Sequence, residues 1–147
     1  MFNIKEYFEN NCTDAEVVRF FTDYKDSSSY ICDAISERAD SMIDIYNYDL
    51  IEWAKSHIVE IDDAAEELGK PDSFIGYIQQ AQFLYYDRFF YDNLEEGIRY
   101  AVYSVLLENG IEELTDEKAE EVDIFIDGLD NNSQFSELSE VLEIVKE

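Results

Sequence analysis

Apolar residues recur along most of the chain at intervals of three and four, which is the spacing of one face of an α-helix. The longest such segment covers about residues 74–108 and ends before Gly110. A helix of about 35 residues would rise about 50 Å. Gly97 lies inside this segment and marks a candidate bend, because glycine weakens a helix interior. The pattern therefore predicts one long central helix with a bend at Gly97.

Helix-capping residues predict shorter helices on both sides of this segment. Thr13 and Glu16 form a capping box before Val17, and the three serines at 27–29 precede a helix that begins near Ile31. The other expected helices cover residues 50–57, 62–68, 116–127 and 133–145. With one Pro and five Gly in the chain, turn residues are scarce. This scarcity favours an all-α fold.

The length of 147 residues suits one domain. Hydrophobic residues make up 46% of the chain and aromatic residues 15%, which is enough to form a core and argues against disorder. We find no internal repeat and no linker rich in Gly, Ser or Pro. Residues 1–147 are therefore expected to form a single acidic helical domain. Neither a signal peptide nor a membrane-spanning segment is expected.

The net charge is the feature that departs most from an ordinary domain. Thirty-six Asp and Glu stand against ten Lys and Arg, for a formal charge of −26. Self-repulsion at this charge costs stability, whereas solubility needs a magnitude of only roughly 2–8. Duplex DNA carries the same charge in about 44 Å, or roughly 13 base pairs. Binding to nucleic acid or to an anionic membrane is therefore disfavoured, and a basic protein is the expected partner.

Residues with catalytic or metal-binding chemistry are few. His57 is the only histidine, and its position at the end of an amphipathic helix favours a capping role. Cys12 and Cys32 are expected to be free thiols in a reducing compartment, and they are too few for a structural zinc site. Residues 127–132 lack the ligand order of a calcium loop and favour a helix stop and a turn. We therefore predict no enzymatic activity, no cofactor and no metal.

Acidic residues three or four positions apart share a helix face. Successive turns rise about 5.4 Å, and neighbouring helices lie ~8–10 Å apart, so rows of carboxylates would form a lattice comparable to phosphates. A solvated face is the alternative, but the number of rows and the scarcity of Lys favour a binding role. The predicted partner-binding residues are Asp33, Glu37, Asp40, Asp44, Asp49, Glu52, Asp62, Asp63, Glu66, Glu67, Asp72, Asp87, Asp92, Glu95, Glu96, Glu117, Glu120 and Glu121.

Two segments carry a resemblance to a known family. The first comprises Asp33-Ala34-Ile35, Ala39-Asp40 and the Ile-Tyr-Asn-Tyr-Asp-Leu run at 45–50. The second comprises Pro71-Asp72-Ser73 followed by Ile-Gln-Gln-Ala-Gln at 78–82. Together they resemble the Ocr (overcome classical restriction) family of phage antirestriction proteins, over roughly residues 28–100.

The resemblance implies an all-helical, dimeric DNA mimic that occupies the DNA groove of type I restriction-modification enzymes. The corresponding acids would be Asp33, Asp40, Asp49 and Asp72, and the protein would act in the cytoplasm of an infected bacterial host. The Ocr-like core would cover residues 28–110, and residues 111–147 would form C-terminal acidic helices.

This sequence also departs from the family pattern. Proline is absent before Tyr46, where the family has it. Two further helices are expected after Gly110, where the family ends in an acidic tail. Aromatic residues are also more frequent here. Because of these departures, the resemblance does not define the dimer interface, the bend or the exact target of this chain.

Three functions compete on this evidence. The first is a DNA-mimic inhibitor of a bacterial defence protein, with a type I restriction-modification complex as first target and a CRISPR effector as second, since the nucleic-acid channel of the latter is also basic. The second is an acidic adaptor or chaperone-like module that binds a basic protein without mimicking DNA. The third is an enzyme that uses a pair of carboxylates.

Overall fold

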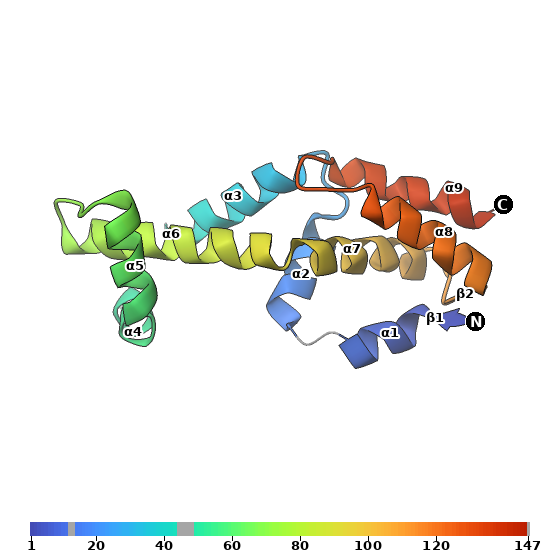
Figure 1. Ribbon diagram of the computed structural model, residues 1–147, viewed down its shortest axis with the longest axis horizontal. Coiled ribbons are helices and arrows are strands. Elements are labelled where there is room, and N and C mark those ends of the chain that lie inside the picture. The colour runs from blue at the N-terminus through green and yellow to red at the C-terminus, as the bar shows by residue number, and fades with distance from the viewer. Residues whose placement is uncertain (12–13, 44–48, 147) are drawn as a thin grey trace. The chain divides into compact units, whose positions relative to one another are not determined.

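The computed structural model describes residues 1–11, 14–43 and 49–146. The chain divides into two compact units, one formed by Met1–Ala34 with Asn93–Glu147 and the other by Ile35–Asp92. We call these unit 1 and unit 2. In the described residues, nine α-helices and one 3₁₀ helix make up nearly all the regular structure (Figure 1). This confirms the all-α prediction, whereas the single domain stays a prediction.

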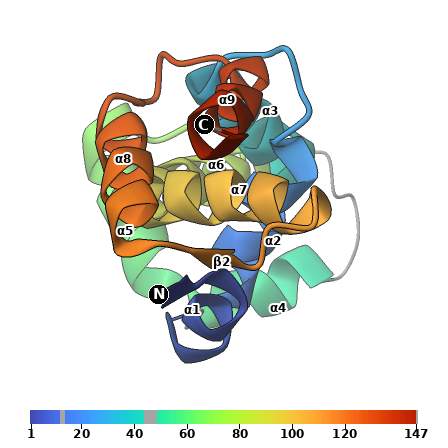
Figure 2. The same cartoon turned by 90° about the vertical axis from the view of Figure 1, so that its right-hand side faces the viewer.

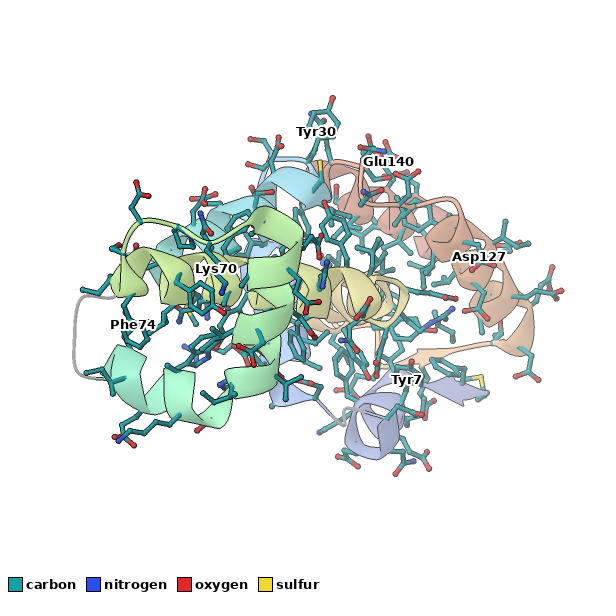
Figure 3. All side chains as sticks on the ribbon, turned by 60° about the vertical axis from the view of Figure 1, so that its left-hand side comes forward. Tyr7, Tyr30, Lys70, Phe74, Asp127 and Glu140 are labelled. Carbon is teal, nitrogen blue, oxygen red and sulfur yellow. The ribbon has the colours of Figure 1, made fainter. Side chains whose placement is uncertain are left out.

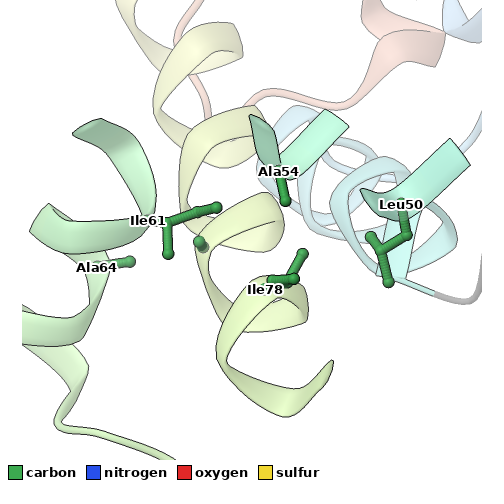
Figure 4. Packing of buried hydrophobic residues seen from close by; sticks show 6 residues of the cluster. Leu50, Ala54, Ile61, Ala64 and Ile78 are labelled. Carbon is green, nitrogen blue, oxygen red and sulfur yellow. The ribbon is translucent and has the colours of Figure 1, made fainter. Parts of the chain in front are cut away.

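Unit 2 is built on three helices that share one small core. They are α4 (Asp49–Ser56), α5 (Ile58–Leu68) and α6 (Phe74–Asp92), and α5 packs against α6. Leu50 and Ala54 of α4 belong to the same buried cluster as Ile61 of α5 (Figure 4). Their burial removes apolar surface from water and holds the three helices together. The other members of the core are Ala64, Ile78 and Ala81, with Trp53, Tyr77 and Leu84 partly buried against them.

Unit 1 is organised around α7 (Leu94–Glu108). Helix α1 (Ile4–Asn11) lies on one side of α7, and α9 (Val141–Lys146) lies on the opposite side (Figures 1 and 2). Helix α2 (Ala15–Tyr24) also packs against α7, as does α8 (Asp116–Asp127). The largest fully buried side chains here include Phe21, Tyr100, Leu106, Phe135 and Leu138. Several of the aromatic residues that the composition revealed therefore belong to the core of unit 1.

The N-terminal edge of unit 1 contains structure that the periodicity did not predict. Strand β1 (Phe2–Asn3) pairs antiparallel with β2 (Glu113–Leu114), with Phe2 opposite Leu114. Helix α1 follows β1 directly. Two-residue strands are too short to leave a period in the sequence, so only the tertiary pairing defines them.

The helical run expected over residues 74–108 is present, but it is interrupted at Asn93. Asn93 has φ −107° and ψ 16°, outside the helical region, and it separates α6 from α7. Asparagine is a weak helix former because its side chain competes for backbone hydrogen bonds. The interruption therefore falls at Asn93 and not at Gly97, the position predicted for a bend, because Gly97 lies inside α7.

Several predicted helix ends are confirmed. Gly69 and Gly110, both with φ 79°, follow α5 and α7, in the left-handed region where glycine is favoured. Thr115 caps α8 by accepting a hydrogen bond from the Lys118 amide at 3.2 Å. At the start of α2 the cap is Asp14, which accepts from the following amides. The predicted Thr13 lies outside the described residues.

The start of α3 (Ile31–Ile43) is capped from a distant part of unit 1. The amides of Ile31 and Cys32 donate to the carbonyl oxygens of Ser133 and Asn131, at 3.0 and 2.7 Å. These two donors would otherwise lack partners at a helix N-terminus. The cap expected from the serines at 27–29 is therefore replaced, for these two amides, by backbone carbonyls that arrive through the tertiary fold.

The last segment begins later than predicted. The 3₁₀ helix η1 (Phe135–Glu140) comes first and is followed by α9. The turn expected at residues 127–132 is present, because Asp130 Oδ1 accepts from the Asn132 amide at 2.9 Å. This Asx turn reverses the chain between α8 and η1.

Candidate functional site

The predicted partner-binding carboxylates that the structure describes lie on the helices α3 to α8, with Asp72 just before α6. On α5, Asp62, Asp63, Glu66 and Glu67 are all exposed. Glu67 forms an ion pair with Arg88 of α6, and Asp62 accepts a hydrogen bond from the Tyr77 hydroxyl at 3.4 Å. Asp63 and Glu66 form no ion pair within the described residues. Helix α5 thus presents a row of carboxylates that is only partly neutralised.

On α3, the exposed acids are Asp33, Glu37 and Asp40, each about one turn from the next. Asp44 lies outside the described residues, and so does the side chain of Asp49 at the start of α4. Glu52 is exposed and pairs with Lys55, one turn away on α4, at 3.1 Å. The row predicted on α3 is therefore present as far as the structure describes it.

The acids expected along one long central helix fall on two separate helices, α6 of unit 2 and α7 of unit 1. Asp92 ends α6, and Glu95 and Glu96 lie in the first turn of α7. Acids in a first turn also stabilise the helix by facing the positive end of its dipole. Glu96 is half-buried and accepts a hydrogen bond from the Tyr100 hydroxyl. Part of this predicted site therefore stabilises the helix.

Asp72 and Asp87 differ in how much of each side chain reaches solvent. Asp72 precedes α6 and is exposed. Asp87 lies within α6 and is half-buried, and burial raises its pKa even though the charge of Arg88 acts in the opposite direction. Asp87 is therefore a poorer candidate for a partner's cation than its exposed neighbours.

Helix α8 carries the acidic row of unit 1. Glu117 and Glu120 are exposed, while Glu121 is half-buried and pairs with Lys118 at 3.2 Å. Asp127 extends the exposed face and projects outward in Figure 3. The same face carries Ile124, whose side chain is 67% exposed. Helix α8 thus presents an exposed face that combines the carboxylates of Glu117, Glu120 and Asp127 with one apolar side chain.

Several of the few cations are already engaged in joining helices. Lys25, whose side chain is only 10% exposed, pairs with Glu108 at 2.9 Å, and Arg99 of α7 pairs with Asp123 of α8 at 2.5 Å. Arg19 pairs within α2. These three side chains neutralise carboxylates within unit 1. The remaining cations with ion pairs in the described residues are the N-terminal amine of Met1, Lys55, Arg88 and Lys118.

The Arg99 site combines its ion pair with a second hydrogen bond and a ring contact. Burial disfavours the charged form of Arg99, but hydrogen bonds with Asp123 and with the Tyr103 hydroxyl outweigh it and raise the pKa of Arg99 further above its usual range. The guanidinium also lies 5.9 Å from the centre of the Tyr103 ring, within the range of a cation–π contact. Arg99 is thus a permanent cation that joins α7 to α8.

His57 has the capping role that its position predicted. Its Nδ1 donates to the carbonyl oxygen of Trp53 at 2.8 Å, in the last turn of α4, which satisfies a carbonyl without a helical partner. The ring stacks on Trp53 at 4.4 Å and meets Tyr85 edge-on at 5.0 Å. The capping bond fixes the tautomer, because a carbonyl only accepts.

The described residues contain no group of three or more His, Cys, Asp and Glu side chains arranged to hold a metal ion. Cys32 is a free, half-buried thiol, whereas Cys12 lies outside the described residues. Where the structure describes the chain, no helix combines the length and the apolar character needed to cross a bilayer.

Sequence reasoning missed a cavity of about 180 Å³ between α5 and α6. Its walls combine carboxylates with the rings of Tyr85 and Phe89. The two aromatic residues are four positions apart and therefore share a face of α6. This spacing was the only feature of the sequence that could have indicated an aromatic wall. Only the crossing of α5 over α6 brings the acids of α5 to that face.

Comparisons with protein-family models, with curated proteins and with solved structures found no match to this chain.

Proposed function

We propose that this chain is a DNA-mimic inhibitor that occupies the basic DNA-binding groove of a bacterial defence protein. The observation that carries the proposal is the division of charge described above. Cations such as Lys25, Arg88 and Arg99 are paired inside the units. Exposed acids that form no ion pair within the described residues remain on three helices: Asp33, Glu37 and Asp40 on α3, Asp63 and Glu66 on α5, and Glu117 and Glu120 on α8. Folded helices hold these acids at repeating intervals, as a polyanion holds its phosphates.

Inhibition would follow from competition for the same cations. Lys and Arg that grip phosphates in DNA would pair with the carboxylates of this chain, and the opposite charges would accelerate association. A type I restriction-modification complex is the first target, on the resemblance to the Ocr family, and a CRISPR effector is the second. The protein would act in the cytoplasm of an infected bacterial host, and pairing of two chains stays a prediction from the same resemblance.

A competition experiment tests the proposal directly. A purified type I restriction-modification complex is bound to a fluorescent duplex that contains its recognition site, and the protein is titrated in. We expect displacement of the duplex, and we expect the affinity of the protein for the complex to fall steeply between 50 and 200 mM salt. Six to ten engaged charges would reduce this affinity by a factor of about 10³–10⁵.

Poly-glutamate of equal charge is the control, and it should compete far less because it has no rigid frame. Simultaneous binding of protein and duplex would refute the proposal for this target, and the same assay with a CRISPR effector tests the second.

Graded neutralisation separates mimicry from catalysis. Sets of three exposed acids on α3, α5 and α8 are changed to their amides, one set after another. A mimic should lose affinity stepwise with each set, because every carboxylate contributes a small share. An abrupt loss of all effect on changing one pair would instead indicate an enzyme.

A second candidate is an acidic adaptor that binds a basic protein without imitating DNA. The observation in its favour is the exposure of large apolar side chains near the acids, with Phe74 and Ile124 69% and 67% exposed. Phosphates offer no apolar counterpart, whereas protein interfaces use such residues as anchors. An adaptor would bind its partner while leaving that partner's DNA binding intact, so the same competition experiment distinguishes the two.

A further inference from the structure

The cavity between α5 and α6 combines two kinds of wall within unit 2. Glu60 and Asp63 of α5 and Asp92 of α6 contribute carboxylates, while Tyr85 and Phe89 of α6 contribute aromatic rings. Leu84 and Arg88 complete the lining. Its volume of about 180 Å³ lies below the range of about 300–1,000 Å³ typical of pockets for drug-sized ligands. The size therefore suits a single side chain better than a free metabolite.

The rings and the acids favour the same kind of occupant. The rings of Tyr85 and Phe89 are stacked at 6.3 Å with 21° between their planes. Aromatic faces attract cations, and guanidinium groups stack on them best among protein side chains. Carboxylates beside such faces add charge-assisted hydrogen bonds. A neutral or anionic group would lack a favourable interaction with at least one of the two walls, the aromatic rings or the carboxylates.

The charge of the cavity remains negative although Arg88 lines it. Arg88 forms an ion pair with Glu67 of α5, which neutralises it. No ion pair reaches Glu60, Asp63 or Asp92 from the described residues. The guanidinium of Arg88 is therefore already neutralised by Glu67. The three other carboxylates of the cavity remain able to pair with a second guanidinium.

We infer that this cavity receives one arginine side chain of the basic partner, whose guanidinium lies against Tyr85 and Phe89 and pairs with Glu60, Asp63 or Asp92. The inference rests on the proposed function only for the origin of the arginine. It adds a specific contact to a surface that would otherwise act through diffuse charge.

A second cavity, which has acidic walls but no aromatic ones, provides a comparison. In unit 1, a cavity of about 250 Å³ also has acidic walls, from Glu95, Asp127 and Asp130. Its apolar walls are aliphatic, formed by Leu94, Ile98, Ile126 and Leu129. Aliphatic walls accept the stem of any long cationic side chain, and they do not favour arginine over lysine. Of the two cavities, only the α5–α6 cavity is therefore expected to prefer arginine over lysine.

Trp53 provides a direct readout, because it is the only tryptophan of the chain and its ring lies edge-on to Tyr85 at 6.2 Å. Trp53 fluorescence is followed while the full chain is titrated with the peptide acetyl-Gly-Gly-Arg-Gly-Gly-amide. Peptides with lysine or uncharged citrulline replace the arginine as controls. We expect a saturable change with arginine, about threefold weaker binding of lysine, and none with citrulline. Equal responses to all three peptides would overturn the inference.

Variants test which walls matter. Glu60→Gln, Asp63→Asn and Asp92→Asn together should weaken arginine-peptide binding about tenfold or more. The matched control changes Glu9, Glu140 and Glu143 to Gln, three exposed acids that line no cavity described here. The control removes the same charge and should weaken binding less than twofold. Equal losses in the two triple variants would reduce the effect to net charge and overturn the inference.

Phe89→Leu keeps the apolar volume and removes one ring. We expect it to abolish the preference for arginine over lysine while leaving the helical circular dichroism unchanged. An unchanged preference would overturn the role assigned to the rings. The DNA competition experiment fails or succeeds independently of these titrations, because it measures displacement of a duplex and they measure occupation of one cavity.

Discussion

The ring of Phe21 on α2 occupies the space that any side chain at Gly97 on α7 would need. A Cβ placed on Gly97 would lie 2.2 Å from Phe21 Cε2 and 2.3 Å from Cδ2. Phe21 is fully buried, so its ring has little room to move. The glycine therefore permits the close packing of α2 on α7.

Gly97→Ala should destabilise the protein, although alanine is the better helix former by about 1 kcal/mol. Overpacking of this kind costs roughly 1–3 kcal/mol, so chemical denaturation should show a net loss. Gly128→Ala is the matched control, because its Cβ would meet nothing closer than 3.5 Å, and it should be neutral or stabilising. Gly97→Ala combined with Phe21→Leu should recover part of the loss. A stabilised Gly97→Ala variant would contradict the packing argument.

Asp14→Ala should destabilise α2 by about 0.5–2 kcal/mol through loss of its N-cap. The Asp14 carboxylate accepts from the amides of Glu16 and Val17 at 3.1 and 3.2 Å. Asp14→Asn removes the same charge but keeps an acceptor, and it should stay near the wild-type stability in urea unfolding. If both variants lost equal stability, the charge of Asp14 and not its capping bonds would be responsible.

Asp123→Ala should lower the free energy of unfolding by about 1–3 kcal/mol, because it leaves the partly buried Arg99 without its carboxylate. General charge repulsion predicts the opposite sign, since the variant removes an acid from a chain of net charge −26. Glu120→Ala on the same helix removes an exposed acid without an ion pair in the described residues, and it should be neutral or slightly stabilising. Thermal denaturation of the two variants side by side decides between the explanations.

Asp87→Asn should stabilise the protein at neutral pH. Burial raises the pKa of Asp87 in the folded chain above its ordinary value, so the unfolded chain ionises first as pH rises. Wild-type stability therefore falls between the unfolded pKa, about 3.9, and the raised folded value, and the deficit persists at higher pH. Asp87→Asn removes this deficit, so its advantage should vanish below about pH 3. An advantage of equal size at all pH values would exclude ionisation as its cause.

Added salt should stabilise the native protein. The chain carries a net charge of −26, and raising ionic strength from 0.01 to 0.15 M shortens the Debye length from about 30 to about 8 Å. Repulsion between exposed acids is screened, while partly buried pairs such as Lys25 with Glu108 lose less. We expect the thermal midpoint to rise with sodium chloride over this range. A constant or falling midpoint would mean that self-repulsion does not limit the stability.

Periodicity and capping residues were sufficient to predict the helical class and many helix ends. The glycines at 69 and 110 end helices because their left-handed φ is accessible to glycine without strain. Thr115 caps α8 through a bond to an amide three residues later. Such interactions lie within one turn of the chain, so the local sequence determines them. The exposure of most acids follows equally from their own chemistry, because an unpaired buried charge is too costly.

Tertiary structure decided the features that join distant residues. The cap of α3 comes from carbonyls about a hundred positions away, and the role of Gly97 depends on a ring from α2. The partners of Lys25 and Arg99 are likewise on other helices, and no local rule selects one carboxylate among so many. The cavity beside Tyr85 forms because α5 crosses α6. Local chemistry thus determined which segments are helical and charged, whereas packing determined which carboxylates are neutralised by a cation of the same unit and which are not.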